Sequence, residues 1–203
     1  MKKSILSVMT VLLLSSTVSV TYAEDLKVKT ISTPSATEKN NEKLATKIQL
    51  YGYWAGTVSA YNDLNKKLMK DAKNLDKKYD FSHFVFKHGD LMLSYPVMAE
   101  EKVNGEITNI ETKSSSFIER IPTWKSYLIT DTSKFIEPFH SDEIKDIDKK
   151  LWEDNSKIGW KKGEEAVEND YKNKLKQLNE DYNGMKKYAT LLKEKKVEEP
   201  SIF

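Results

Sequence analysis

The residues best suited to metal binding lie in the stretch DFSHFVFKHGD. His83 and His88 are five residues apart and lie between Asp80 and Asp90. Ligands on one face of a helix recur every three or four residues, so this spacing does not bring both imidazoles to one ion. The apolar residues between the two histidines are typical of a core. We therefore predict no metal site in this stretch.

Paired carboxylates and hydroxyl nucleophiles are the next candidates for chemistry. Asp142 and Asp146 are four residues apart, as are Glu164 and Glu168, but lysines surround both pairs. This pattern is typical of a solvated helix face with ion pairs rather than of catalytic acids. The sequence contains no phosphate-binding loop, dinucleotide fingerprint, HExxH zinc motif or GxSxG elbow.

Composition alone does not exclude two kinds of enzyme site. A Ser-His-Asp set is compatible with the residues present, although no local signature marks a nucleophile. Tyrosine and tryptophan side chains could line a sugar-binding cleft, but at helical spacing such residues more often form a core or a protein interface. We predict no catalytic residue and no cofactor, and we expect that the protein is not an enzyme.

The N-terminal residues are typical of an export signal. Lys2 and Lys3 follow Met1, and an apolar stretch comes next. Thr21 and Ala23 then provide small residues at the two positions that a signal peptidase reads. We predict a signal peptide over residues 1–23 that is cleaved between Ala23 and Glu24. A membrane anchor is the alternative, but the stretch is short for a span and lacks a basic cluster after it.

Charge and cysteine content exclude two classes of partner or site. The chain has 33 basic and 31 acidic residues, and loss of Lys2 and Lys3 with the signal leaves 31 of each. A neutral mature protein gives no electrostatic reason to bind nucleic acid directly. The chain has no cysteine, so it forms no disulfide and cannot bind a metal through thiolate.

Helical periodicity occupies both ends of the exported chain. Residues 24–41 are polar and aperiodic, which predicts a flexible tether, and residues 42–200 are predicted to form a single domain. Apolar residues recur at steps of three and four from Glu42 to about Tyr79. A second such run begins at Ser141, where a Ser cap precedes two acidic residues, and continues to Leu192.

A β-hairpin is predicted between these helices. Leu91–Val103 and Glu106–Ile121 flank Asn104-Gly105, the pair of residues that most favours a two-residue turn because both tolerate positive φ. The preceding FSHFVFKHGD is expected to be an aromatic connector. The predicted fold class is α+β, predominantly α-helical, with long N- and C-terminal helices packed together and a small β-hairpin between them.

Gly184 interrupts the second helical run with a turn signal, Asn183-Gly184. The residues on both sides nevertheless share one stripe with alternating steps of four and three, so we predict one helix that continues through Gly184. A glycine inside a helix costs about 1 kcal/mol relative to Ala, which a packed stripe can offset. The stripe consists of Tyr171, Leu175, Leu178, Tyr182, Met185, Ala189 and Leu192.

Two glycine pairs predict a close crossing of the long helices. In each pair the glycines are four residues apart on one helical face and enclose a tryptophan. Small residues on one face let two helix axes approach, and we expect the flanking tryptophans to lock over the contact. Coincidence in a charged helix is the alternative. The pairs are Gly52 and Gly56 around Trp54, and Gly159 and Gly163 around Trp160.

Several strings resemble the DotC family, which includes the TraI protein of IncI-type plasmid conjugation. These strings are NLDKKYDFSHF, YPVMAEE, IPTWKSYL, and the long LWEDNSKIGWKKGEEAVENDYKNKLKQLNEDYNGMKKYATLL, in the order in which the family has them. The resemblance extends from about Leu44 to Pro200, and PTWKSYL and DYNGM are its most specific parts. Family members usually carry a lipobox cysteine and a longer C-terminal segment, and this sequence has neither.

The resemblance implies a structural and assembly role without catalysis. Family members belong to the outer-membrane core complex of type IVB secretion systems, and with a DotD-like lipoprotein they help to place the DotH-like component. By this resemblance the protein is exported to the periplasm and associates with the outer membrane, through partners since it has no lipobox cysteine. The candidate partner interface is PTWKSYL with Trp124 and Tyr127, although burial of this element in the core is an equal alternative. A free-standing periplasmic adaptor or chaperone and a cell-wall enzyme are the competing functions.

Overall fold

The structure is a computed structural model that describes residues 36–138 and 147–199. The predicted signal peptide, its cleavage site at Ala23 and Glu24, and the predicted cap Ser141 lie outside these residues. The first helix begins at Ala36 rather than at Glu42, so residues 36–41 of the predicted tether are helical. Alanine, glutamate and lysine in this stretch favour helix, which explains how the helix extends beyond its apolar stripe.

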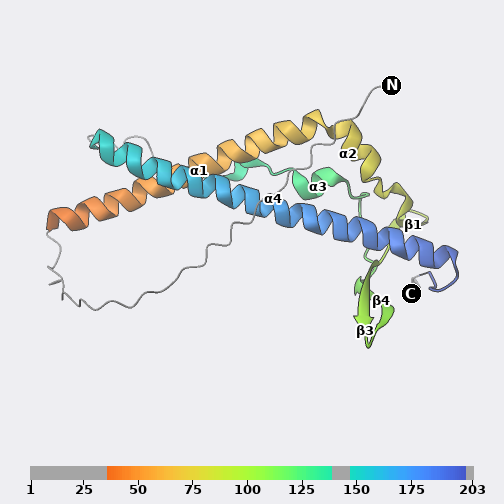
Figure 1. Cartoon of the computed structure of the whole chain (residues 1–203). Coiled ribbons are helices and arrows are strands. Elements are labelled where there is room, and N and C mark those ends of the chain that lie inside the picture. Colours follow the sequence, from red (N-terminus) through yellow and green to blue (C-terminus); the bar gives the residue numbers. More distant parts are fainter. Residues whose placement is uncertain (1–35, 139–146, 200–203) are drawn as a thin grey trace, which may run out of the picture. The chain divides into compact units, whose positions relative to one another are not determined.

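Two long helices form the body of the protein. Helix α1 spans Ala36–Lys70 and α4 spans Lys149–Lys193, with 35 and 45 residues. Figure 1 shows that they cross and that both run in the same direction, from the orange and cyan ends to the yellow and blue ends. Helix α4 is continuous through Gly184, which confirms the prediction from its apolar stripe.

Helix α4 starts later than predicted, and α1 ends earlier. Ile147 precedes the cap without helical structure, and Asp148 is the N-cap, whose side chain accepts a hydrogen bond from the N–H of Leu151. At the end of α1 the chain breaks at Asp71, whose carbonyl accepts bonds from the N–H groups of Asn74 and Leu75. These bonds start the short helix α2, Ala72–Lys78, in a new direction (Figure 1).

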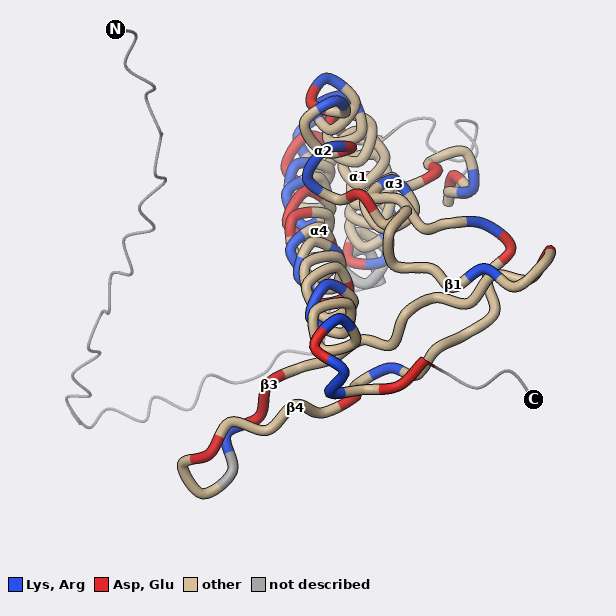
Figure 2. The backbone as a smooth tube through the Cα atoms, turned by 90° about the vertical axis from the view of Figure 1, so that its right-hand side faces the viewer, with Lys and Arg blue, Asp and Glu red and all other residues tan. Residues whose placement is uncertain are grey.

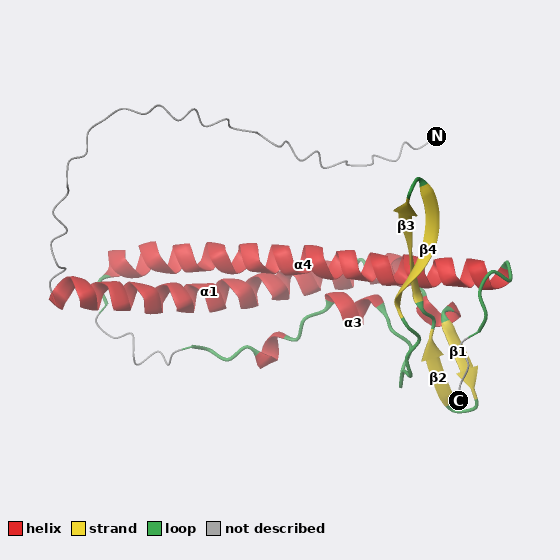
Figure 3. Ribbon diagram, turned by 90° about the horizontal axis from the view of Figure 1, so that it is seen from below, coloured by secondary structure: helices red, strands yellow, loops and turns green. Residues whose placement is uncertain are grey.

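Two antiparallel hairpins follow α2 instead of the one predicted. The 3-10 helix η1 spans Phe81–His83 and precedes both hairpins. In the first hairpin, strand β1 (Val85–His88) pairs with β2 (Leu91–Ser94). In the second, β3 (Val97–Val103) pairs with β4 (Glu106–Lys113). The predicted connector therefore contains η1 and a strand. Figure 3 shows the hairpins on opposite sides of the helix pair.

Turn chemistry explains this division. Asn104 and Gly105 have φ of 51° and 89°, which confirms the predicted two-residue turn. Gly89, at φ 59°, lies in the turn of the other hairpin. Pro96 separates β2 from β3, because a proline has no N–H to donate to a strand ladder.

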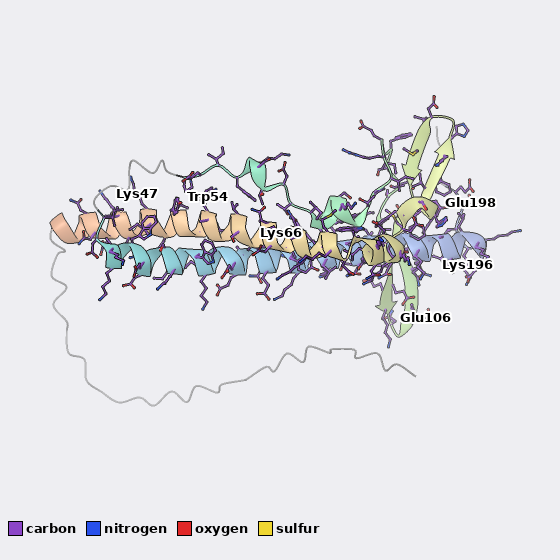
Figure 4. All side chains as sticks on the ribbon, turned by 90° about the horizontal axis from the view of Figure 1, so that it is seen from above. Lys47, Trp54, Lys66, Glu106, Lys196 and Glu198 are labelled. Atoms are coloured by element: carbon purple, nitrogen blue, oxygen red, sulfur yellow. The ribbon has the colours of Figure 1, made fainter. Side chains whose placement is uncertain are left out.

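The parallel direction of the long helices requires the chain to return along them. After α3, Trp124–Leu128, residues 129–138 run back beside α1 and include the 3-10 helix η2, Thr132–Lys134. Asn65 Nδ2 donates to the carbonyl of Thr130 at 2.8 Å, and Trp54 Nε1 donates to that of Phe135 at 3.4 Å. Figure 4 labels Trp54 on the side of α1 where this segment lies.

The core lies where α2, α3 and the bases of both hairpins meet the C-terminal half of α4. Trp124 is its largest fully buried side chain. The other buried residues of this cluster are Leu68, Tyr79, Phe81, Phe84, Val97, Leu128, Leu178 and Met185. Aromatic rings dominate the contacts; Tyr182, for example, meets Phe81 edge-on at 5.2 Å between ring centroids.

The outer face of α4 carries alternating acidic and basic residues (Figure 2). Lys172 Nζ lies 2.7 Å from Glu168, and Lys161 pairs with Glu165 in the same i, i+4 pattern. These contacts confirm that Glu168 belongs to a solvated face with ion pairs. Among the described residues, no helix combines the length and the apolar character that crossing a membrane requires.

Candidate functional site

The two predicted glycine pairs lie opposite each other where α1 crosses α4. A Cβ atom on Gly56 would lie 2.5 Å from the carbonyl oxygen of Trp160, and one on Gly52 would collide with the backbone of Ser156. In the reverse direction, Gly159 and Gly163 face the backbone of α1 between Gln49 and Thr57. Each helix therefore supplies a backbone surface on which the other rests.

The tryptophans beside these glycines do not close over the crossing. Trp160 is 39% exposed. Trp54 instead packs against Tyr51, with 5.6 Å between ring centroids, and donates to the return segment. The exposed Trp160 therefore does not lock over the helix contact as expected, and Trp54 contacts its own helix and the return segment.

Gly184 lies outside the crossing and meets the β3–β4 hairpin. A Cβ atom there would overlap a methyl group of Val97 and lie 2.8 Å from the carbonyl oxygen of Met98. The missing side chain thus admits the first residues of β3 against the backbone of α4. This contact joins the strands to the long helix at one position.

Asp181, one turn before Gly184, binds groups from two other elements. Its Oδ1 accepts a bond from Lys113 Nζ at 2.5 Å, and its Oδ2 accepts one from the hydroxyl of Tyr127 at 3.0 Å. The side chain of Asp181 is 8% exposed, whereas that of Lys113 is 49% exposed. One buried carboxylate therefore holds the end of β4 and helix α3 to α4.

Burial and the nearby charge of Asp181 raise the pKa of the Tyr127 hydroxyl above its ordinary value. Burial is the larger cause, since it disfavours the phenolate, and the negative carboxylate adds repulsion. Tyr127 thus remains a neutral hydrogen-bond donor to Asp181 well above neutral pH. The contact is structural, because it orients α3 without activating the hydroxyl as a base.

A groove of about 710 Å³ lies beside this junction, between the hairpin and α4. Its charged groups are matched in pairs: Lys187 binds Glu100, Lys176 lies 3.7 Å from Glu180, and Lys113 binds Asp181. An internally neutralised groove does not present the convergent unpaired polar groups that mark most catalytic clefts.

The structure corrects the predicted partner interface. Trp124 has no exposed surface, and its Nε1 donates to Asp76 at 2.7 Å. Tyr127 is half-buried and stacks on Phe81 at 5.9 Å between ring centroids. Trp124 therefore belongs to the core of the protein, since docking of a partner onto it would require opening that core.

The histidines considered as metal ligands are exposed, and His83 Nε2 lies 3.5 Å from Asp80 within one turn. Across residues 36–138 and 147–199, no group of three or more His, Cys, Asp or Glu side chains could hold a metal ion.

Sequence reasoning missed Asp181 and Lys113. Asp181 belongs to DYNGM and lies within the apolar stripe, three residues after Leu178 and four before Met185. A charged residue on the buried face of a helix needs a partner, so its position was a usable signal. The identity of that partner, 68 positions away in the chain, had no local signal.

Residues 38–203 match the model of a family described as "Type IV secretory system, conjugal DNA-protein transfer". The matched region includes α1 from its first turn, both hairpins, α3 and α4. The chain belongs to this family. The comparison with curated proteins finds no match.

Membership in this family confirms the resemblance to DotC and TraI. It makes the protein a component of a type IV secretion or conjugation system, with other subunits of that system as partners. The glycine crossing and the Gly184 junction both lie within the matched residues.

Proposed function

We propose that the protein is a structural and assembly subunit of the outer-membrane core complex of a type IVB secretion or conjugation system. In this role it is exported, resides in the periplasm at the outer membrane, and helps to hold a DotH-like component together with a DotD-like lipoprotein. The single observation that carries the proposal is the family match over the whole described fold, from α1 to the end of α4.

The geometry supports a scaffold rather than a catalyst. Helices of 35 and 45 residues, about 52 and 68 Å long at the usual rise, lie backbone to backbone at the glycine crossing. Such a close contact resists bending and sliding, so the helix pair can fix the distance between its two ends. The hairpins at one end then supply surface for neighbouring subunits (Figure 3).

The charge distribution does not favour direct binding of the transferred DNA. Acidic and basic residues alternate along α4 instead of forming one basic stripe (Figure 2). We therefore expect contact with neighbouring proteins rather than with nucleic acid, and association with the outer membrane through those proteins.

The test is to delete the gene and follow the DotH-like component by fractionation of the cell envelope. We expect the component to leave the outer-membrane fraction and transfer of DNA or effector to stop. The wild-type gene and the exposed variant Lys162→Ala should both restore placement, whereas Gly163→Leu should restore it poorly because the helix crossing fails.

Normal fractionation of the DotH-like component in the deletion strain would contradict the assembly role. If the protein then co-purified with periplasmic clients from solubilised envelopes, it would act as a free-standing adaptor or chaperone. Cell-wall hydrolysis that is lost in a panel of single carboxylate variants would instead indicate an enzyme.

A further inference from the structure

The β3–β4 hairpin has one covered edge and one open edge. Strand β3 lies against α4, where the backbone of Met98 meets Gly184. Strand β4 forms the other side of a two-stranded sheet and, among the residues that the structure describes, pairs with β3 alone. Figures 1 and 3 show the hairpin projecting away from the helix pair, and Figure 4 labels Glu106 near its free end.

The turn determines which backbone groups of β4 face outward. A two-residue turn makes the flanking pair, Val103 and Glu106, a hydrogen-bonded pair, and hydrogen-bonded and non-bonded pairs then alternate along the ladder. Ile107, Asn109 and Glu111 occupy the non-bonded positions. Their N–H and C=O groups therefore point away from β3, toward the open edge.

This edge carries glutamates but lacks three of the usual protections against strand addition. Natural edge strands carry lysine, proline or a bulge that prevents pairing with another chain. Residues 106–112 contain no lysine, arginine or proline, and the one register shift of the hairpin lies at its base, between Val97 and Met98. Ile107 is 67% exposed on the same strand. An open edge with an exposed apolar side chain is typical of a pairing surface.

Charge indicates what kind of strand can pair there. Glu106 and Glu111 lie on β4, and Glu101 lies on β3. Residues 98–112 contain one lysine, Lys102, and no arginine. Within the described ranges none of these three glutamates forms an ion pair, whereas Glu100, opposite Asn109, and Lys113, at the base of the hairpin, are bound to α4. The unpaired glutamates therefore make the hairpin acidic.

We propose that the open edge of β4 binds an extended, lysine- or arginine-bearing segment of another protein, which adds to the hairpin as a third strand. The backbone groups of Ile107, Asn109 and Glu111 supply the hydrogen bonds, and the glutamates attract the cationic side chains. A second copy of β4 fits less well, because it would bring two more glutamates against the same edge. The inference goes beyond the proposed function, since a free-standing adaptor could use the same edge.

The test uses the full chain and a fluorescent peptide of about ten residues that alternates lysine and valine. A matched peptide carries glutamate in place of lysine. We expect the lysine peptide to bind at least about tenfold more tightly than the glutamate peptide, with an affinity that falls as salt rises. Binding should slow amide hydrogen exchange at Ile107, Asn109 and Glu111.

Two variants separate strand pairing from simple charge attraction. Asn109→Pro removes an outward N–H without touching the β3 ladder and should weaken binding about tenfold. The double variant Glu106→Lys with Glu111→Lys should reverse the preference between the two peptides. Glu164→Lys, the same charge change at an exposed position of α4, should leave both affinities unchanged, and the melting temperature checks that each variant folds.

Four results would overturn the proposal. They are absence of binding by the lysine peptide, equal affinity for the two peptides, unchanged affinity in Asn109→Pro, or exchange protection elsewhere on the chain. Sedimentation equilibrium adds a fifth: a dimer that Asn109→Pro dissociates would assign the edge to a second copy of the chain instead.

Discussion

The backbone of Met98 lies directly against Gly184, so that a Cβ atom on Gly184 would lie 2.8 Å from the Met98 carbonyl oxygen. This contact positions β3, and with it the projecting hairpin, on the long helix α4. Because the close neighbours are backbone atoms as well as the Val97 side chain, a larger residue cannot be accommodated by a change of rotamer alone.

Gly184→Ala should therefore destabilise the protein even though Ala favours helix. We expect a net loss of about 1–2 kcal/mol in the free energy of unfolding, because overpacking exceeds the gain in helix propensity. Urea denaturation measures the change. Asn183→Ala, at the exposed neighbouring position, is the matched control and should be neutral or slightly stabilising; a more stable Gly184→Ala would show that β3 does not rest on this residue.

Gly163→Leu should separate the two long helices. Its Cβ would lie 2.8 Å from the backbone nitrogen of Thr57, and the rest of the leucine has no space at the crossing. We expect a loss of about 3 kcal/mol or more and a sharply lower Tm, and Gly56→Leu should act in the same way. Lys162→Leu is the exposed control. An unchanged melt at both glycines would contradict the close crossing.

Asp181→Ala should loosen the attachment of β4 and α3 to α4. The Tyr127 hydroxyl would lose its acceptor and Lys113 its partner, at a cost of about 1–3 kcal/mol. Asp181→Asn keeps an acceptor for Tyr127 and should cost less. Asp63→Ala removes an exposed carboxylate 3.6 Å from Lys66 and should change stability by less than about 0.5 kcal/mol. Equal losses at positions 181 and 63 would refute the structural role of Asp181.

The pH dependence of stability should reflect Tyr127. Its pKa is raised in the folded protein by burial and by Asp181, so the neutral hydroxyl is favoured by folding. The resulting stability is complete below the ordinary tyrosine pKa of about 10 and is lost as the pH rises through the folded value. Urea midpoints at mildly and strongly alkaline pH should therefore fall less in Tyr127→Phe than in the wild type. Identical alkaline losses would exclude Tyr127 as the cause and leave other groups as the explanation, such as Tyr61, whose pKa is also raised by burial.

The C-terminus of α4 offers a stabilising substitution. Lys195 has φ of 57°, and the N–H of Lys196 bonds to the Leu191 carbonyl at 2.9 Å in a Schellman motif. Glycine adopts this φ without the strain of a side chain, so Lys195→Gly should raise stability by about 1 kcal/mol. Lys186→Gly, at an exposed position inside the helix, should lower it by a similar amount. A loss at both positions would mean that the left-handed turn at Lys195 is not formed in solution.

Local patterns in the sequence determined the main elements. The unbroken stripe from Tyr171 through Tyr182 to Ala189 predicted a helix through Gly184, because side chains of one face must share a register to pack. Asn104-Gly105 predicted its turn, because few other residues tolerate positive φ at two successive positions. Gly56 and Gly163 indicated close backbone contact, because a glycine has no Cβ atom to keep another backbone away.

Only the tertiary structure decided how these elements meet. Periodicity does not encode direction, so the parallel course of α1 and α4, and the return segment that it requires, had no signal in the sequence. The break at Asp71 depends on carbonyl and N–H groups that any sequence possesses. Trp124 could serve a core or an interface equally well until its neighbours were known. The sequence therefore determined which residues form helices and turns, since these depend on near neighbours. The structure decided which backbone lies against Gly184 and which cation binds Asp181, since these contacts join residues far apart in the chain.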